Sequence, residues 1–375
     1  MARPIVIAAG GTGGHLFPAE ALAVALLARG ERIALMTDAR SAAFDSPAFA
    51  NAERFLLAGA GLSGRGAVSA LRGAAALVAG TFAARRIFKR LDASAVVGFG
   101  GYASVPPLMA ASMMAKARRP ALVLHEQNAV LGRANRALAP RADLLALSFA
   151  ETTRVPPGAR REVLGNPVRP ALAALSGGSY PAPDGALRLL VTGGSLGARI
   201  FADVVPDAIA LLPEALRARL VVTQQARAED FTRTRDAYAA LGIPAEVSAF
   251  FPDIANRLSM AQLVIARAGA STIAELACAG RPSILVPLPH AIDDHQSANA
   301  RALSDAGAAL VVPQPGFTPQ ALADALSALL TDAGRLSRMA AAARPLARPD
   351  AASALADRVQ ALVAARLVPD VAEAG

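Results

Sequence analysis

The sequence predicts an α/β protein built from two Rossmann-like domains that face one another across a cleft. Short apolar runs alternate with helical stretches along most of the chain, which is typical of parallel sheets covered by helices. The order strand, glycine turn, helix occurs at the start of the chain and again from residue 187. A chain of 375 residues is also too long for one ordinary domain, because domains usually hold about 100–200 residues.

The first half of the chain is predicted to form one domain, residues 1–168. Its expected elements, in order, are a strand at 4–9, a glycine turn at 10–14, a helix at 17–29 that Gly30 ends, strands at 32–37 and 95–98, a loop at 100–102, a helix near 107–115 and a strand at 121–125. Each predicted strand is a short apolar run, as expected of strands that are covered on both faces.

The second half repeats this pattern and is predicted to form a domain of residues 169–375. Residues 176–185 are rich in Gly, Pro and Ser, which predicts a linker. The expected elements beyond it are a strand at 187–192, a glycine turn at 193–197, a helix through 209, strands at 220–223, 263–266 and 283–286, and a last helix at 351–367. Ligands of such sheets bind beyond the carboxyl ends of the strands, where both glycine turns are expected.

Charge is divided unevenly between the two halves. Residues 1–168 hold 20 Lys+Arg and 10 Asp+Glu, a net charge of +10, whereas residues 169–375 hold 18 and 19, a net charge of −1. This asymmetry favours a polyanionic partner for the first half, either nucleic acid or an anionic membrane surface. Because aromatic residues make up 4% of the chain and Trp is absent, few base-stacking platforms exist, and the membrane is favoured over nucleic acid.

The sequence also predicts that the protein stays in the cytosol. Its longest uncharged apolar stretches, 73–84 and 103–115, fall short of the roughly 18–20 residues that span a bilayer. Five consecutive apolar residues precede the first glycines, fewer than the 7–15 typical of a signal peptide. The single cysteine, Cys278, fits a reducing compartment and is expected to pack in the core.

Both glycine turns are candidate anion sites. Glycine lets backbone N–H groups approach a phosphate closely, and the helix that follows adds a favourable dipole. A dinucleotide fingerprint is an alternative that Asp38 favours, but Leu16 stands where the last glycine of that motif belongs. No Gly-Lys-Ser/Thr follows either turn, which argues against a Walker A loop. A further alternative is that the turns merely join strand to helix.

Seven motifs are spread over nearly the whole chain. They are GGTGGH at 10–15, GFGGYASVP at 98–106, HEQN at 125–128, GNPVR at 165–169, GGSLGAR at 193–199, AGASTIAEL at 268–276 and DHQ at 294–296. In this order they resemble the MurG family, the N-acetylglucosaminyltransferases of the two-domain GT-B type that convert lipid I to lipid II. The resemblance implies a role in peptidoglycan synthesis and therefore in cell wall biogenesis, cell shape and cell division.

The resemblance also implies a donor site in the second domain for UDP-N-acetylglucosamine (UDP-GlcNAc). Arg169 and Ser195 would lie near the phosphates, and Gln296 would bind the sugar hydroxyls. The nucleotide and its ribose would be held by Ala270, Ser271, Thr272 and Glu275, the last of which stands one helical turn beyond a loop at 269–272. A carboxylate can accept two ribose hydroxyl hydrogen bonds and a guanidinium can neutralise a diphosphate. Without the resemblance, a solvated carboxylate and a surface arginine would be the simpler interpretation.

Two residues depart from the family pattern. Phe251 stands where the family commonly has a smaller aliphatic residue next to the uracil, and His295 precedes Gln296 where some members have a second glutamine. We therefore expect uracil and sugar contacts that differ in detail, with the class of donor unchanged.

On the acceptor side, His15 is the expected general base. An imidazole with an ordinary pKa near 6.5 suits removal of a proton from an attacking sugar hydroxyl. The resemblance leaves open whether His15 is the base or positions the acceptor diphosphate. Asn128 would support the acceptor or the bound donor, although an Asn at such a position also often caps a turn. The same side of the cleft would be completed by Thr12, Gly13 and Gly14.

No metal and no cofactor are expected. No two Asp residues are two positions apart, so the D-x-D sequence that holds Mg²⁺ in many sugar transferases is missing. The cluster His290, Asp293, Asp294 and His295 is an alternative metal site, although a polar loop is the simpler interpretation. Helix N-termini and Arg169 are expected to stabilise the charge on departing UDP.

Residues 65–91 predict a basic amphipathic surface helix. They hold six basic residues and no acid, with Val68, Leu71, Ala75, Val78 and Phe82 at helical spacing. Such a helix can bind an anionic leaflet, because each cation adds about 1 kcal/mol and buried apolar side chains add more. The alternative is an ordinary core-packing helix. With the resemblance, a peripheral enzyme on the cytoplasmic face of the inner membrane is favoured.

The sequence therefore predicts an inverting transferase that moves N-acetylglucosamine from UDP-GlcNAc to the 4-hydroxyl of undecaprenyl-diphospho-N-acetylmuramoyl-pentapeptide. The domains are expected to close over the donor and exclude water. Alternatives are a related GT-B enzyme with another lipid acceptor, such as a diacylglycerol galactosyltransferase, and a UDP-GlcNAc 2-epimerase, which needs no acceptor. A nucleic-acid-binding protein is the least favoured.

Overall fold

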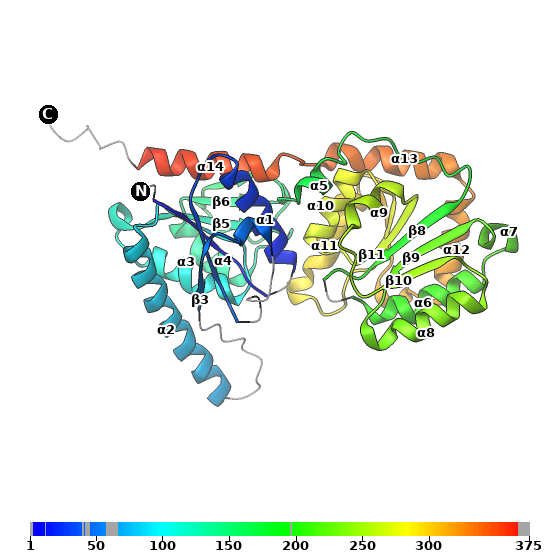
Figure 1. Ribbon diagram of the computed structural model, residues 1–375, viewed down its shortest axis with the longest axis horizontal. Helices are drawn as coiled ribbons and strands as arrows, with labels where there is room; N and C mark the ends of the chain where they lie inside the picture. Colours follow the sequence, from blue (N-terminus) through cyan, green and yellow to red (C-terminus); the bar gives the residue numbers. More distant parts are fainter. Residues whose placement is uncertain are drawn as a thin grey trace. The chain divides into compact units, whose positions relative to one another are not determined.

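The computed structural model describes residues 3–11, 13–39, 41, 46–57, 67–195 and 197–366. The chain divides into two compact units, each with its own sheet and core (Figure 1). The first unit comprises Met1–Arg169 and Asp350–Gly375, and the second comprises Pro170–Pro349. The predicted α/β class with two Rossmann-like domains is confirmed.

The first unit is built on a parallel sheet in the order β3-β2-β1-β4-β5-β6-β7. Its strands are β1 (Ile5–Ala8), β2 (Ile33–Thr37), β3 (Glu53–Leu56), β4 (Ala95–Gly98), β5 (Ala121–Glu126), β6 (Leu144–Leu147) and β7 (Arg161–Val163). In register, Ile5 of β1 pairs with Ile33 of β2 on one side and Ala95 of β4 on the other. The strand order reverses between β1 and β4, which is the topological switch point where ligands of such sheets bind.

Helices cover both faces of this sheet. They are α1 (Gly13–Leu27), α2 (Ala67–Leu91), α3 (Val105–Ser112), α4 (Arg133–Leu138) and α14 (Ala351–Ala365). Ile5 and Ile7 share one core layer with α1 and α14, whereas Val6 and Ala8 share the other with α2 and α3. Two layers arise because successive side chains of a strand point to opposite faces of the sheet.

The second unit has a parallel sheet in the order β10-β9-β8-β11-β12-β13. Its strands are β8 (Leu187–Thr192), β9 (Leu220–Gln225), β10 (Ala245–Ser248), β11 (Leu263–Ala266), β12 (Ser283–Leu285) and β13 (Ala309–Val311). Its helices are α5 (Pro170–Ala173), α6 (Arg199–Ala210), α7 (Glu214–Arg217), α8 (Phe231–Ala240), α9 (Ile254–Met260), α10 (Ala270–Ala279), α11 (His295–Ser304), α12 (Pro319–Leu330) and α13 (Ala333–Ala343). Here the switch point lies between β8 and β11.

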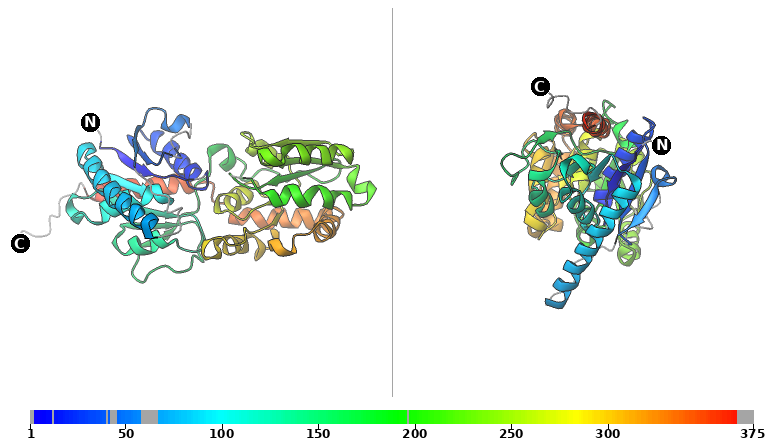
Figure 2. Two further views of the ribbon diagram at one scale, coloured as in Figure 1. Left: turned by 90° about the horizontal axis from the view of Figure 1, so that it is seen from below. Right: turned by 90° about the vertical axis from the view of Figure 1, so that its left-hand side faces the viewer.

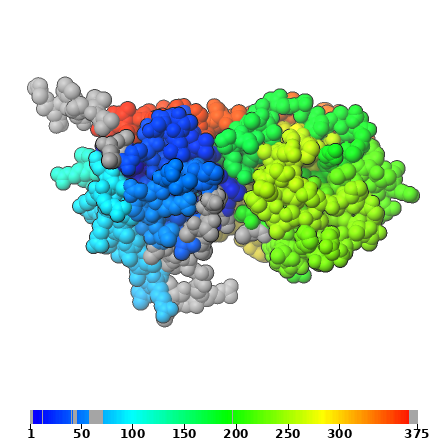
Figure 3. Space-filling view, viewed as in Figure 1, coloured from blue at the N-terminus to red at the C-terminus, as the bar shows by residue number. Residues whose placement is uncertain are grey.

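The last helix, α14, belongs to the first unit, which differs from the predicted domain 169–375. Its residues Leu355, Ala356 and Val359 are fully buried in the core layer of α1. In the space-filling view the red surface of α14 adjoins the blue surface of the N-terminal segment (Figure 3). The chain therefore crosses between the units twice, because an apolar face of α14 is buried only by returning to the first sheet.

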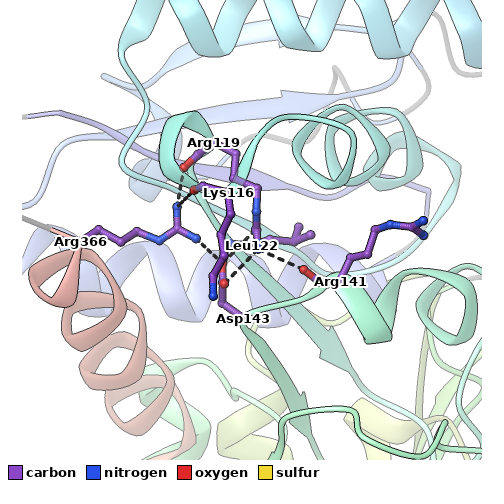
Figure 4. A network of polar contacts seen from close by, with 6 residues as sticks. All are labelled: Lys116, Arg119, Leu122, Arg141, Asp143 and Arg366. Atoms are coloured by element: carbon purple, nitrogen blue, oxygen red, sulfur yellow. Dashed lines mark hydrogen bonds and ion pairs between the residues drawn. The ribbon is translucent and has the colours of Figure 1, made fainter. Parts of the chain in front are cut away.

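A buried ion network fastens the end of α14 (Figure 4). Asp143, just before β6, accepts two hydrogen bonds of 2.9 Å from Arg119 and one of 2.6 Å from Arg366. Its carboxylate also accepts a hydrogen bond from the amide of Leu122 at 2.7 Å. Because the side chains of Arg119 and Asp143 are each 6% exposed, this ion pair is protected from water, and through Arg366 it anchors the end of α14.

Residues 176–185 are part of the second unit, so the linker predicted there is wrong. Tyr180 donates a hydrogen bond of 2.8 Å to the carbonyl of Gln262, and Arg344 donates one of 2.7 Å to the carbonyl of Gly178. The units instead join at Arg169–Pro170 and at Pro349–Asp350. Gly, Pro and Ser here shape a loop that lies on its own domain, which composition alone does not distinguish from a linker.

Candidate functional site

The glycine turn after β1 touches the loop after β4, at the switch point of the first unit. Gly101 has a φ of +73°, and a Cβ there would lie 2.4 Å from the carbonyl oxygen of Gly10. A Cβ on Gly10 would lie 2.5 Å from that of Ala103. Both loops therefore need glycine for this close approach. Thr12, which was predicted to line the same site, lies outside the described residues.

His15 lies in the first turn of α1, at this switch point. The predicted helix starts at residue 17, but the structure begins α1 at Gly13, so Gly13, Gly14 and His15 form its first turn. The ring of His15 lies against the loop after β4, since a Cβ on Gly100 would be 3.0 Å from its Cε1. The topology thus brings together the first two glycine motifs.

A chain of polar contacts links His15 to the ends of β5 and β7. Nδ1 of His15 lies 3.3 Å from Oε1 of Gln127, and Nε2 of Gln127 lies 3.1 Å from Nδ1 of His125. Nε2 of His125 lies 3.1 Å from the carbonyl oxygen of Gly165. Burial lowers the pKa of His125 from 6.5 to about 4, so this imidazole is neutral at physiological pH.

Asn128 is held by the buried carboxylate of Glu126. Oε1 of Glu126 accepts hydrogen bonds from the backbone amide and from Nδ2 of Asn128, at 3.0 and 3.2 Å. Its Oε2 accepts from Gly132 N and Asn135 Nδ2, both at 2.9 Å. This set of donors fixes the loop after β5, so Asn128 is placed at the carboxyl edge of the sheet together with His15 and Gln127.

Asp38 serves the glycine turn instead of a ribose. It is 2% exposed, and its Oδ1 accepts a hydrogen bond of 2.9 Å from the amide of Ser41. Oγ of Ser41 in turn accepts a hydrogen bond of 2.7 Å from the amide of Gly11. The one residue that favoured a dinucleotide site is therefore used to shape the turn.

Arg169 lies at the end of the first unit, not in the second domain where it was predicted. Its guanidinium carbon is 4.4 Å from the centre of the Phe17 ring in α1, which is a cation–π contact. Phe17 follows His15 by two residues, so the cation lies at the N-terminal part of α1. Its predicted contact with the donor diphosphate stays a prediction.

The second glycine turn, after β8, is held by Gln225 at the end of β9. Oε1 of Gln225 accepts from the amide of Gly193 at 3.0 Å, and its Nε2 donates to the carbonyl of Gly194 at 2.8 Å. A Cβ on Gly193 would lie 2.2 Å from the amide nitrogen of Ala198, so glycine is required there. Ser195 is part of this turn, which precedes α6 at the second switch point.

The segment predicted to bind the nucleotide, expected to be a loop at 269–272, is the start of a helix. Gly269 is the N-cap of α10, and Ala270, Ser271 and Thr272 form the first turn. Glu275 follows one turn later and is half-buried. The carbonyl of Ala268 accepts a hydrogen bond of 3.1 Å from Asn299, a fully buried residue of α11. Because α10 follows β11, its amides lie beside the β8 turn at the switch point.

Gln296 lies in the first turn of α11, which follows a loop with unusual backbone conformations. His290, Asp293 and Asp294 have φ angles of +62°, +56° and +52°, a region that non-glycine residues rarely adopt. Oε1 of Gln296 accepts a hydrogen bond of 2.9 Å from the amide of Leu288, which closes this loop. The His/Asp cluster there does not gather into a metal site, since no group of three or more such ligands is found among the described residues.

Phe251 is buried beside Arg257. It is 6% exposed, and the guanidinium carbon of Arg257 lies 4.1 Å from the centre of its ring. Arg257 is itself held by Glu246 and Asp253, at 2.6 and 2.8 Å. One face of the Phe251 ring is therefore covered by Arg257. The predicted contact of Phe251 with the uracil stays a prediction.

Arg267 is a buried cation that the sequence analysis missed. It follows β11, is 8% exposed, and donates to the carbonyls of Val286 and Pro287 at 3.1 Å and to Oε1 of Gln314 at 2.6 Å. Burial lowers its pKa, and the nearby Arg227 lowers it further. These three acceptors are neutral, so the guanidinium contributes positive charge next to α10. Its position one residue beyond a buried strand was the available signal.

Helix α2 exposes its predicted apolar stripe. Leu71, Val78 and Phe82 are 74%, 54% and 58% exposed, whereas Ala84 and Phe88 on the opposite side are buried in the core. The first part of the helix extends beyond the rest of the unit (Figure 2). The core-packing alternative is therefore wrong for this stripe. Arg65 and the side chain of Val68 lie outside the described residues. No helix among the described residues is long and apolar enough to cross a membrane.

Both units match models of one family. Residues 5–146 match the glycosyltransferase family 28 N-terminal domain, and residues 188–355 match the glycosyltransferase family 28 C-terminal domain. The chain is 56% identical to the UDP-N-acetylglucosamine–N-acetylmuramyl-(pentapeptide) pyrophosphoryl-undecaprenol N-acetylglucosamine transferase of Granulibacter bethesdensis, over 96% of this chain and 93% of the relative.

Two further comparisons agree. The transferase of the same name from Acidiphilium cryptum is 53% identical over 98% of this chain and 99% of its own. The crystal structure of Acinetobacter baumannii MurG is similar with a TM-score of 0.76 and 30% identity, covering 96% of this chain and 99% of that one. These matches confirm the resemblance predicted from the seven motifs.

Proposed function

This chain belongs to glycosyltransferase family 28, and from that premise we propose that it is the transferase that converts lipid I to lipid II. It moves N-acetylglucosamine from UDP-GlcNAc to the muramoyl-pentapeptide that is carried on undecaprenyl diphosphate. The observation that carries this function is the identity of 56% to a relative of that name over nearly both whole chains. Because the relatives' name specifies a muramyl acceptor, transfer to another lipid and epimerisation without an acceptor are not favoured.

The second unit binds the donor in this proposal. Amides of the Gly193 turn and of the first turn of α10 lie at one switch point, where they can donate to the diphosphate. Ser195, Ser271 and Thr272 add hydroxyls there, and Glu275 accepts the ribose hydroxyls. Gln296 exchanges its hydrogen bond to Leu288 for one to the sugar. The buried charge of Arg267 stabilises the negative charge that develops on departing UDP.

The first unit binds the acceptor and supplies the base. His15 takes the proton of the 4-hydroxyl as that oxygen attacks the anomeric carbon of the donor. The bond from this carbon to the β-phosphate oxygen breaks, and its electron pair leaves with UDP. Attack opposite the leaving group inverts the α-linkage to β through an oxocarbenium-like transition state, with no covalent enzyme intermediate. Arg169, stacked on Phe17, neutralises the charge of the donor diphosphate.

The exposed stripe of α2 lets the enzyme bind the membrane that holds its acceptor. Leu71, Val78 and Phe82 can enter the interface, while Arg85, Arg86 and Lys89 on the same helix attract anionic lipids. We place the protein as a peripheral enzyme at the cytoplasmic face of the membrane. No described helix could anchor it by spanning the bilayer.

Two substitutions test the assignment of the two half-sites. Glu275→Ala should raise the KM for UDP-GlcNAc and leave kcat nearly unchanged, because it removes a contact made equally before and during reaction. His15→Gln should lower kcat by about 10²–10⁴-fold with a smaller effect on donor affinity. Near-normal turnover by His15→Gln would remove it from the catalytic role, and an unchanged KM in Glu275→Ala would remove that residue from the donor site.

A further inference from the structure

A continuous hydrogen-bond chain runs from a backbone carbonyl to the ring of the proposed base. It passes from Gly165 to His125, then to Gln127, then to His15, over distances of 3.1, 3.1 and 3.3 Å. His125 and Gln127 are 0% and 3% exposed. The two side chains lie on the same side of the chain because they are two residues apart at the end of β5, whereas Glu126 between them faces Asn128 and Gly132.

The direction of each hydrogen bond follows from the carbonyl oxygen of Gly165. A carbonyl can only accept, so Nε2 of His125 carries the hydrogen. Since this buried imidazole is neutral, its Nδ1 carries a lone pair and must face a donor, the amide NH₂ of Gln127. The amide oxygen of Gln127 is then left facing Nδ1 of His15 and can only accept. Nδ1 of His15 therefore carries a hydrogen, and in neutral His15 the lone pair is on Nε2.

We propose that His125 and Gln127 are positioning residues that hold His15 in the tautomer with the hydrogen on Nδ1 and the lone pair on Nε2. This inference rests on the proposed function, in which His15 is the base. In the transfer step Nε2 takes the proton of the attacking 4-hydroxyl while the donor's anomeric C–O bond breaks toward UDP. The imidazolium that forms keeps its Nδ1 hydrogen bond to the amide oxygen of Gln127. The amide orients the ring without adding a negative charge beside it.

The tautomer itself can be observed without an activity assay. The chain has 4 histidines, so ¹⁵N-histidine labelling gives a simple long-range ¹H–¹⁵N spectrum, and His15→Gln and His125→Leu assign two of them. The wild-type protein above the pKa of its histidines should show a protonated Nδ1 for His15 and a protonated Nε2 for His125. A protonated Nε2 on neutral His15, or a protonated Nδ1 on neutral His125, would overturn the proposal.

Kinetics test whether the two residues act through one chain. Gln127→Met keeps the length of the side chain and removes both hydrogen bonds, so we expect kcat to fall about tenfold, with the KM for UDP-GlcNAc within about twofold. His125→Leu should lower kcat in the same way. The double variant should be no slower than Gln127→Met alone, because the second change removes an element of an already broken chain. Multiplicative losses would mean independent structural roles and would overturn the proposal.

A matched control is Gln262→Met in the second unit. Gln262, just before β11, is 5% exposed, and its side-chain amide also makes two hydrogen bonds: it accepts one from the amide of Arg188 and donates one to the carbonyl of Ala182. This variant should keep both kcat and the tautomer of His15, which excludes a general effect of burying Met for Gln. If His15 is not the base, His15→Gln turns over normally, while the spectrum of the wild type still reports the tautomer. The two failures are therefore distinguishable.

Discussion

Nε2 of His125 lies 3.1 Å from the carbonyl oxygen of Gly165, in a position with no exposure to water. Burial lowers the pKa of this imidazole from 6.5 to about 4, so the unfolded chain binds a proton more readily than the folded one. The free energy of unfolding is therefore unaffected by this group above pH 6.5, and it decreases as the pH falls from 6.5 toward 4 because the unfolded chain takes up the proton first. From the two pKa values we expect a loss of about 3 kcal/mol over this range.

Calorimetry of the wild type and of His125→Leu between pH 4 and 7 measures this effect. The free energy of unfolding of the first unit should fall more steeply with decreasing pH in the wild type than in the variant. Parallel curves would show that His125 is not the group that titrates.

Gly101 should tolerate no side chain. Its Cβ would meet the carbonyl oxygen of Gly10 at 2.4 Å, and its φ of +73° is itself unfavourable for other residues. We expect Gly101→Ala to cost about 3 kcal/mol or more and to impair transfer, because the two loops at the switch point would separate. Gly158→Ala is the matched control, with a φ of +75° and no atom within 4 Å of the new Cβ.

Gly158→Ala should cost about 1–2 kcal/mol, from the backbone conformation alone. Urea unfolding of both variants separates the two contributions. Equal losses would mean that the Gly10 contact is not what requires glycine at position 101.

Asp143 should be important for the docking of α14. Asp143→Ala leaves Arg119, whose side chain is 6% exposed, without its carboxylate, and we expect a loss of about 3–5 kcal/mol. Glu162 is the matched control, because it also binds an arginine of α14, Arg358, at 2.7 Å, but with side chains 36% and 52% exposed. Glu162→Ala should cost at most about 1 kcal/mol. Comparable losses in thermal unfolding would contradict the importance of burial here.

The exposed stripe of α2 should govern membrane binding. Phe82→Asp removes an apolar side chain that is 58% exposed, and we expect binding to anionic vesicles to weaken at least about tenfold. Turnover of a water-soluble acceptor analogue should stay unchanged. Leu211→Asp in the second unit, at 53% exposure, is the control and should bind vesicles like the wild type. Cosedimentation of all three proteins with phosphatidylglycerol vesicles measures this, and equal binding would exclude α2 as the membrane contact.

The central strands and both glycine turns were predictable from the sequence because buried parallel strands are short apolar runs next to glycine. Strands β3, β7 and β10 were missed because their sequences ERFL, REV and AEVS carry no such run. The edge strand β13 and the buried strand β6, with the short apolar sequences ALV and LLAL, were missed as well. Helix α14 was predicted with nearly correct bounds, but its return to the first unit depends on contacts far apart in the sequence.

The roles of Gln127, Gln225 and Arg267 could not be derived from sequence reasoning alone. Each stands at or just beyond the end of a buried strand, but a partner of each is supplied by a different helix or loop that lies far away in the sequence. The family resemblance gave His15 and Glu275, while the hydrogen bonds that hold the surrounding loops became visible only with the fold.

The central claim is tested most directly by supplying UDP-GlcNAc with and without a lipid I analogue. The account predicts that UDP release requires the acceptor, that one UDP forms per disaccharide, and that the new linkage is β to the 4-hydroxyl of the muramoyl sugar. The account is contradicted if UDP-GlcNAc is converted to the same extent without the acceptor as with it. It is also contradicted if the folded enzyme forms no disaccharide.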